Sequence, residues 1–167
     1  DLGAAVCGVG RVYDEPDIQR DPKMILPNAK CIIGFGFAVP KGLYLTMENN
    51  SQYYTYTSIG VKYVDEEMAE IFLLKIGGMI EDEGYEAIPY GHQSDWRAIN
   101  NTGYMKKDFS RPVAPGKAAP DVMVQLRIAG YLCGLGEIGY SKMLLTPEFG
   151  PRQRVGIIIT ELELEPD

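Results

Sequence analysis

KCIIGFGFAV, residues 30–39, is the strongest strand signal in the chain. After Lys30 the run is apolar throughout, which is typical of a strand that is covered on both faces. Its two glycines, Gly34 and Gly36, indicate that another backbone or a ligand comes close to the strand. We therefore expect a central strand with a packed layer on each side.

Further elements follow from the patterning on either side of this strand. Short apolar runs predict strands at residues 4–9, 86–89 and 155–160, and helical periodicity predicts helices at 65–83 and 122–132. The order β, β, α, β, α, β predicts a single α/β (α+β) domain over residues 1–167, with helices flanking one sheet.

The two helices carry separate expectations. Asp65 is expected to cap the first helix, with acidic residues in the first turn at the positive end of the helix dipole. Its core-facing stripe is expected to comprise Met68, Ile71, Phe72, Ile76, Met79 and Ile80. Asp121 is expected to cap the second helix, which is apolar on most sides and therefore predicted to be buried.

The composition restricts the class of protein. A chain of 167 residues fits one ordinary domain, and its 16 Lys and Arg against 23 Asp and Glu give a net charge of −7. That balance argues against a surface that follows nucleic-acid phosphates. The chain has no apolar run of about 18 residues, so no membrane span is expected. The start at Asp1 shows no signal peptide, which predicts a cytoplasmic protein whose first residues precede this chain.

The three cysteines, Cys7, Cys31 and Cys133, are far apart in apolar runs, where cysteine behaves as a small hydrophobic residue. They favour a reducing compartment and cannot supply four thiolates to an iron–sulfur cluster. With His92 as the single histidine, a zinc site is improbable, and no metal-ligating residue is predicted.

Two regions remain open to a structural or a functional interpretation. Tyr53, Tyr54 and Tyr56 form a dense aromatic group that suits either half-buried packing or the lining of a ligand pocket. Residues 91–120 lack a clear pattern, and a loop of this length is often functional. The loop could cover a pocket as a lid or contribute to a homodimer interface.

Residues Gly134 to Gly139 match GxGxxG letter for letter. The motif follows a predicted helix, whereas a dinucleotide site requires it between a strand and a helix. Its glycines can still let the backbone approach a flat ligand, with Gly150 and the cation of Arg152 a short way further on. The alternative is a tight reversal after the helix, without any ligand.

Five pieces of the C-terminal part come in a characteristic order: Ala129-Gly130, Gly134-Leu135-Gly136, Leu144 to Gly150, Ile158-Ile159-Thr160 and Leu164 to Asp167. This order resembles the segment before the ferredoxin cysteines of epoxyqueuosine reductases and reductive dehalogenases. The block LPNAKCII, residues 26–33, looks like the family's N-terminal strand entry. The tyrosine region and the long loop are not matched.

The resemblance implies a nitroreductase-like core with a mixed sheet that holds base-off cobalamin. It also implies two 4Fe-4S clusters in a following domain that is missing from this chain. The residues implied in cofactor contact are Gly134, Leu135, Gly136, Glu137, Gly139, Thr146, Phe149, Gly150 and Arg152. Asp121 matches the proton-donor aspartate of epoxyqueuosine reductases within about one position, and its capping role is an equal alternative. The dehalogenase pattern, a phenol beside a cation, implies Tyr53, Tyr54 or Tyr56 instead.

The expected function is therefore a cobalamin-dependent reductase, an oxidoreductase that acts on a small molecule or a nucleoside. Its expected partners are the substrate and an iron–sulfur domain or other electron donor. Three alternatives stay open, namely an FMN-binding nitroreductase-like domain, a corrinoid carrier or sensor, and a domain without a cofactor.

Overall fold

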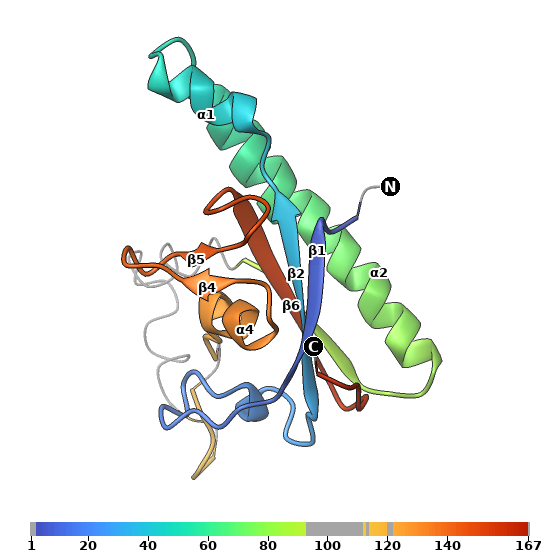
Figure 1. Ribbon diagram of the computed structural model, residues 1–167. Helices are drawn as coiled ribbons and strands as arrows, with labels where there is room; N and C mark the ends of the chain where they lie inside the picture. The colour runs from blue at the N-terminus through green and yellow to red at the C-terminus, as the bar shows by residue number, and fades with distance from the viewer. Residues whose placement is uncertain (1–2, 93–111, 113, 120–121, 167) are drawn as a thin grey trace.

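The computed structural model describes residues 3–92, 112, 114–119 and 122–166 (Figure 1). Asp121 and most of the predicted 91–120 loop lie outside the described residues. The described elements form a four-stranded main sheet with a helical layer on each face and a separate two-stranded sheet, so the predicted α+β fold with flanking helices is confirmed.

The sheet has four strands in the order β1-β2-β6-β3, with bounds β1 Val6–Arg11, β2 Cys31–Ala38, β3 Ala87–Tyr90 and β6 Gln153–Thr160. All three pairings are antiparallel, so the expectation of a mixed sheet is wrong for the described strands. Strands β1 and β6 run in one direction, and strands β2 and β3 run in the opposite direction. In the order β1-β2-β6-β3 the two directions therefore alternate across the whole sheet. The central strand β2 spans the predicted run within one residue at each end.

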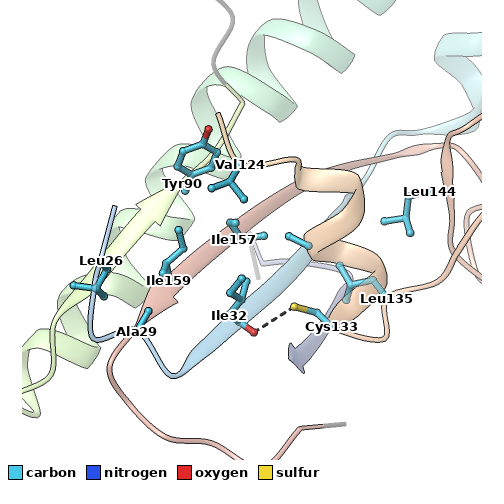
Figure 2. Close-up of a cluster of buried hydrophobic side chains, with 11 residues drawn as sticks. Leu26, Ala29, Ile32, Tyr90, Val124, Cys133, Leu135, Leu144, Ile157 and Ile159 are labelled. Atoms are coloured by element: carbon cyan, nitrogen blue, oxygen red, sulfur yellow. Dashed lines mark hydrogen bonds between the residues drawn. The ribbon is translucent and has the colours of Figure 1, made fainter. Parts of the chain in front are cut away.

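Alternating side chains of β2 and β6 enter two separate cores, because successive residues of a strand point to opposite faces. Ile32 and Ile157 pack on the α4 side, whereas Ile33, Phe35 and Ile158 pack on the α2 side. β2 is therefore covered on both faces, as predicted. Figure 2 shows the core on the α4 side, where the thiol of Cys133 donates to the carbonyl of Ile32 at 3.2 Å.

The glycines of β2 accept close contacts from the protein itself. A Cβ on Gly34 would lie 2.9 Å from the Cβ of Cys133, so α4 (Leu126–Leu132) and its C-terminal end can pack directly on the strand. A Cβ on Gly36 would lie 2.5 Å from a methyl group of Val6 in β1. The close approach predicted at these glycines is thus made by α4 and β1.

The other face is covered by one long helix, built from the π-helix η2 (Tyr56–Met68) and the α-helix α2 (Ala69–Asp82). The prediction that a helix begins at Asp65 is wrong, because Asp65 lies inside η2 and is buried. Ile71 and Met79 of the predicted core stripe are exposed. Ile80 of the predicted stripe is buried, and the other buried residues of α2 are Ala69, Leu73 and Gly77, which were not predicted.

Packing contacts explain this shift of the buried face. A Cβ on Gly156 of β6 would lie 2.6 Å from a methyl carbon of Leu73, and a Cβ on Gly77 would lie 2.8 Å from the ring of Pro89 in β3. Small residues therefore let α2 approach the sheet at Leu73 and Gly77. The apolar residues on either side of this contact line are left partly or largely exposed.

The α4 layer is smaller than the sequence predicts. α4 begins at Leu126 rather than Val122, and only Ala129 and Gly130 are fully buried within it. The prediction of a helix buried on most sides is wrong, because this short helix packs on the sheet with one side only. The short strands β4 (Glu137–Ile138) and β5 (Leu144–Leu145) pair beside it.

Three further features differ from the sequence expectations. The α-helix α1 (Lys41–Glu48) and the 3-10 helix η1 (Pro22–Met24) were not predicted. Cys7 is exposed because it lies on the edge strand β1, whereas Cys31 and Cys133 are buried as expected.

In the part of the chain that the structure describes, no helix combines the length and the apolar character needed to cross a membrane.

Candidate functional site

A cluster of polar side chains, most of them buried or half-buried, lies where η2 meets the start of β6. We call it the Asp65–Arg154 cluster, defined by Tyr44, Tyr56, Asp65, Glu70, His92 and Arg154. Its members come from α1, η2, α2, β6 and the residue pair after β3. A π-helix is rare in proteins and is frequently associated with functional sites.

Arg154 connects the members of the cluster. It lies in β6 opposite Phe37 of β2, so its backbone is held by the centre of the sheet. Its guanidinium donates through Nε to the carbonyl oxygen of Gly60 at 3.1 Å and through Nη2 to the hydroxyl oxygen of Tyr56 at 2.8 Å. The carboxylate of Asp65 lies 3.7 Å from Nε. One cation therefore contacts a phenol, a carboxylate and a helix carbonyl.

Asp65 is buried, with a side chain only 4% exposed. Burial raises the pKa of its carboxyl above the ordinary 3.8, while His92 and Arg154 act in the opposite direction and Glu66 adds to the rise. His92 Nδ1 lies 3.6 Å from the carboxylate. A buried carboxylate is tolerated only beside such partners, because an isolated ionised group would lose its hydration without compensation.

A second carboxyl, Glu70, lies close by on α2. Burial raises its pKa above the ordinary 4.5, the charge of Asp65 raises it further, and His92 lowers it. A Cβ on Gly91 would lie 2.0 Å from Glu70 Oε1, so the carboxyl group packs directly against the backbone before His92. The cluster therefore contains two carboxyls with raised affinity for protons next to a cation.

Tyr44 and Tyr56 form the aromatic side of the cluster. Their ring centroids are 5.1 Å apart, and burial followed by a hydrogen bond with Tyr56 raises the pKa of Tyr44. The charges of Arg154 and Arg152 lower the pKa of Tyr44. The structure thus brings Arg152, a predicted cofactor contact, into the electrostatic surroundings of Tyr44, whose ring lies beside that of the predicted catalytic residue Tyr56.

The three candidate tyrosines have different surroundings. Tyr53 and Tyr54 are exposed, and the hydroxyl of Tyr53 donates to the side chain of Asn50. Only Tyr56 of the three has a guanidinium bonded to its hydroxyl among the interactions described. A guanidinium bonded to a phenol oxygen is placed to stabilise the negative charge that a proton transfer leaves on that oxygen. The geometry therefore favours Tyr56 as the acid among them.

The glycine motif is explained in part by packing within the chain. Gly134 has a φ of +71° directly after α4, which is the usual conformation of a glycine that ends a helix. A Cβ on Gly136 would lie 2.1 Å from the carbonyl oxygen of Leu145, and one on Gly139 would lie 2.7 Å from the Leu145 side chain. Leu135 is buried in the core, while Glu137 is exposed.

The segment from Thr146 to Arg152 is a tight turn before β6. Thr146 and Gly150 exchange two backbone hydrogen bonds, and the buried Thr146 hydroxyl accepts from the amide of Phe149 at 3.2 Å. The φ of Gly150 is +59°. Arg152 donates to the carbonyl of Val39 at 3.5 Å. Phe149 and Arg152 of this turn are half-buried, and the chain then continues into β6, which contains Arg154.

Several members of the cluster were not predicted from the sequence. Asp65 was interpreted as a helix cap, and Glu70, Tyr44 and Arg154 were not singled out. Arg154 had one available signal, because it is a cation placed directly before the apolar run that starts at Val155. Among the described residues, no group of three or more His, Cys, Asp or Glu side chains is arranged to hold a metal ion.

Comparisons with known proteins agree with the sequence resemblance. No family model matches the chain. Over 110 residues, which are 66% of its length, the chain is 34% identical to the tetrachloroethene reductive dehalogenases of Desulfitobacterium hafniense and Dehalobacter restrictus. The aligned part makes up 14% of the length of those proteins.

Solved structures of epoxyqueuosine reductase superpose on 99% of this chain. Two of them, one with a tRNA-Tyr epoxyqueuosine-modified tRNA stem loop, give TM-scores of 0.56 and 0.58 at 15% identity. A third, from Bacillus subtilis with its catalytic loop swung out of the active site, gives 0.55 at 16% identity. The chain spans 44% of the length of each. The predicted resemblance is confirmed, in fold to these structures and in sequence to the dehalogenases.

Proposed function

We propose that the chain is the corrinoid-binding part of a cobalamin-dependent reductase in which Tyr56 donates a proton and Arg154 stabilises the resulting phenolate. The observation that carries the proposal is the 2.8 Å hydrogen bond from Arg154 to the Tyr56 hydroxyl. It occurs in a chain with the fold of epoxyqueuosine reductases and sequence similarity to reductive dehalogenases. The pair supplies the phenol and cation that such a proton transfer needs.

Organohalides are the substrate class that we favour, since the sequence similarity is to proteins named tetrachloroethene reductive dehalogenase. Reductive dehalogenation breaks the carbon–halogen bond and releases halide with the bonding pair. The carbon then takes up two electrons and one proton. Cobalamin, when bound and reduced, supplies the electrons. Tyr56 supplies the proton, Arg154 stabilises the phenolate, and water returns a proton to Tyr56 before the next turnover. A modified nucleoside is the second candidate, because the solved structures with this fold include epoxyqueuosine reductase with a tRNA stem loop.

The residues of the glycine loop fit a corrin in some respects only. The amides of Gly134, Gly139 and Gly150 donate to carbonyl oxygens of the chain itself, so they are engaged. Glu137 is exposed, and the half-buried Arg152 has five N–H donors, of which the structure places one on Val39. Corrin amide groups offer both acceptors and donors. Glu137, Phe149 and Arg152 are therefore the contacts that we assign to the cofactor, with the glycine backbones lining its edge.

Electrons must reach such a site from a donor. Cys31 on β2 and Cys133 at the end of α4 are both buried, and three cysteines in 167 residues cannot ligate a 4Fe-4S cluster with four thiolates. We therefore propose that an iron–sulfur domain or a separate electron carrier outside these residues reduces the cofactor. In the absence of that partner, a chemical reductant replaces it in the experiments below.

Cobalamin binding is tested by a visible absorption titration of the purified chain, with FMN titrated in parallel. We expect the corrin spectrum to shift to the base-off form with a saturable dependence on chain concentration. FMN should show no saturable shift. Binding of FMN alone would contradict the corrinoid assignment and support the flavin alternative. Corrin binding without any turnover in the next experiment would support a carrier or sensor.

Replacing Tyr56 by phenylalanine should lower the rate of product formation by about 10²–10⁴-fold, the usual contribution of a general acid. The rate is measured with the cobalamin-loaded chain, a chemical reductant and tetrachloroethene, after subtraction of the rate with free cobalamin. The affinity for cobalamin should stay unchanged. Tyr54→Phe is the matched control, because Tyr54 is 81% exposed and should retain the wild-type rate. If the two variants lose the same fraction of the rate of product formation, Tyr56 is not the proton donor.

A further inference from the structure

The side chain of Tyr56 is held in place by three parts of the chain. The ring of Tyr44 on α1 lies beside the Tyr56 ring, with the centroids 5.1 Å apart and the planes tilted by 54°. The Tyr56 ring also lies close to the backbone of Gly60, where an added Cβ would come within 3.2 Å of it. The guanidinium of Arg154 is bonded to the hydroxyl oxygen. Both the ring and the oxygen of the proposed acid are therefore fixed.

The bond from Arg154 occupies one acceptor position of the Tyr56 oxygen. A guanidinium has N–H donors and no acceptor, so Tyr56 accepts in the 2.8 Å contact with Nη2. Nε of the same guanidinium donates to the carbonyl oxygen of Gly60 at 3.1 Å, which fixes the direction in which Nη2 points. A phenol oxygen can accept a second hydrogen bond and still donate its own hydrogen.

Tyr44 is hydrogen-bonded to Tyr56 as well. Burial raises the pKa of the Tyr44 hydroxyl, and the hydrogen bond with Tyr56 raises it further. Such a bond raises the pKa of the phenol that supplies the hydrogen, because ionisation of that phenol breaks the bond. Tyr44 is therefore the donor and Tyr56 the acceptor. The Tyr56 oxygen then receives one hydrogen from a guanidinium and one from a phenol, and its own hydrogen is used in neither bond.

We propose that Tyr44 is a positioning residue for the proton transfer from Tyr56: it leaves the Tyr56 hydrogen available to the substrate and donates to the phenolate that remains. The inference rests on the proposed function, in which Tyr56 is the acid. In the transfer the O–H bond of Tyr56 breaks, its electron pair stays on the oxygen, and the proton joins the substrate carbon. Arg154 and Tyr44 keep their own protons throughout.

The two donors act more strongly after the transfer than before it. Hydrogen bonds to an ionised acceptor are shorter and roughly twice as strong as those between neutral groups. Donors that are already in place when the charge develops stabilise it without rearrangement. The bonds from Arg154 and Tyr44 therefore favour the phenolate of Tyr56 over its neutral form, which lowers the barrier to proton transfer.

Tyr44 itself is not placed to be the acid. The charges of Arg154 and Arg152 lower the pKa of its hydroxyl, but burial and the bond with Tyr56 outweigh them, so that the pKa of Tyr44 stays above the ordinary 10.0. Its hydrogen is also engaged on the Tyr56 oxygen. Tyr44 therefore keeps its proton when Tyr56 gives up its own.

Replacing Tyr44 by phenylalanine keeps the ring and removes the hydroxyl. We expect kcat for tetrachloroethene reduction by the cobalamin-loaded chain to fall about 10–100-fold, the size of one hydrogen bond to a charged group. KM, the affinity for cobalamin and the circular dichroism spectrum should stay unchanged. In a Tyr56→Phe background the same replacement should change the rate less than about threefold, because the bond it removes is already absent.

Tyr85→Phe is the matched control for the loss of a tyrosine hydroxyl. Tyr85 is 42% exposed and lies between α2 and β3, outside the Asp65–Arg154 cluster. This variant should retain the wild-type kcat and KM.

NMR of the cofactor-free chain, labelled with carbon-13 at the Cζ atoms of tyrosine, tests the contact itself. The Tyr56 resonance is identified by its absence in Tyr56→Phe. It should move in Tyr44→Phe, because the Cζ shift of a phenol responds to hydrogen bonds at its oxygen, and it should stay in place in Tyr85→Phe.

The results separate this inference from the proposed function. A wild-type kcat in Tyr44→Phe, an equal loss in the Tyr56→Phe background, or an unmoved Tyr56 resonance would each overturn the role of Tyr44 and leave Tyr56 as the acid. A wild-type rate in Tyr56→Phe would instead contradict the proposed function, and the role of Tyr44 would fall with it even if the resonance moves.

Discussion

Replacing Arg154 by methionine is expected to lower the free energy of unfolding by about 3–5 kcal/mol at pH 7, the cost of leaving a buried charge without its partner. Methionine keeps the length of the side chain and removes the hydrogen bonds to Gly60 and Tyr56. The buried carboxylate of Asp65 would then lose the guanidinium that lies 3.7 Å away and keep the ring of His92 at 3.6 Å. The measurement is urea denaturation followed by circular dichroism.

The free energy of unfolding that the Arg154→Met variant loses should be larger at pH 7 than at pH 4. The pKa of Asp65 is already raised by burial, so protonation stabilises the fold below the ordinary value of 3.8, and this contribution is lost as pH rises through the folded-state pKa. Removing Arg154 raises that pKa further, because Arg154 favours the ionised form. The variant should therefore be closer to wild type at pH 4 than at pH 7. A loss that is constant with pH would contradict the role of the Asp65 charge.

Two further variants separate the charge effect from lost packing. Arg152→Met removes a neighbouring arginine with one 3.5 Å hydrogen bond, and should cost less than about 1 kcal/mol. Asp65→Asn combined with Arg154→Met removes both charges, and should recover part of the loss because no carboxylate remains buried without a cation. If the double variant is as unstable as the sum of the single variants, the pair does not interact as proposed.

Gly136→Ala is expected to lower the free energy of unfolding by about 3 kcal/mol, the upper part of the usual range for overpacking. The added Cβ would lie 2.1 Å from the carbonyl oxygen of Leu145 and 2.9 Å from the Cα of Thr146. Both neighbours are backbone atoms, so relief requires a shift of the β4–β5 pair and of the turn that follows it. Urea denaturation measures the loss, and a crystal structure of the variant would show the displaced turn.

The control for this prediction is the same substitution at a position with space. A Cβ on Gly42 of α1 would meet nothing within 4 Å. Gly42→Ala should stabilise the chain by up to about 1 kcal/mol, because alanine has the higher helix propensity. Equal effects at positions 42 and 136 would show that chain flexibility, rather than close packing, determines the role of the glycine motif.

The fold could be predicted from the sequence where the pattern of burial is simple. The run at residues 30–39 is apolar on both sides, and no helix period fits it, so β2 was placed within one residue. The long helix could be predicted only in its α-helical half, because the apolar residues of η2 do not follow the period of 3.6 residues that identifies an α-helix. The four predicted strands are the four strands of the main sheet. Their directions could not be predicted, because strand direction depends on how the connections run and not on the composition of each strand.

The site was harder to predict because its members are distant in the sequence. Asp65 and Arg154 are partners only after β6 is paired with β2 and η2 packs on the sheet. Asp65 next to two glutamates has the appearance of a helix start, and the sequence offers no sign that it is buried. Tyr56 could be named as one of three tyrosines, and only the position of Arg154 distinguishes it from the other two.

The π-helical winding of η2 determines which side chains meet Arg154. Tyr56 and Asp65 are nine residues apart, which is two and a half turns of an α-helix at about 3.6 residues per turn, so an α-helix would point them in opposite directions. A π-helix has a wider turn of roughly 4.4 residues, so nine residues complete about two turns and both side chains reach the same guanidinium. The number of residues per turn therefore determines which side chains of η2 reach Arg154. Deleting one residue between positions 57 and 64 would rotate Tyr56 and Asp65 relative to each other, so that both could no longer contact the guanidinium.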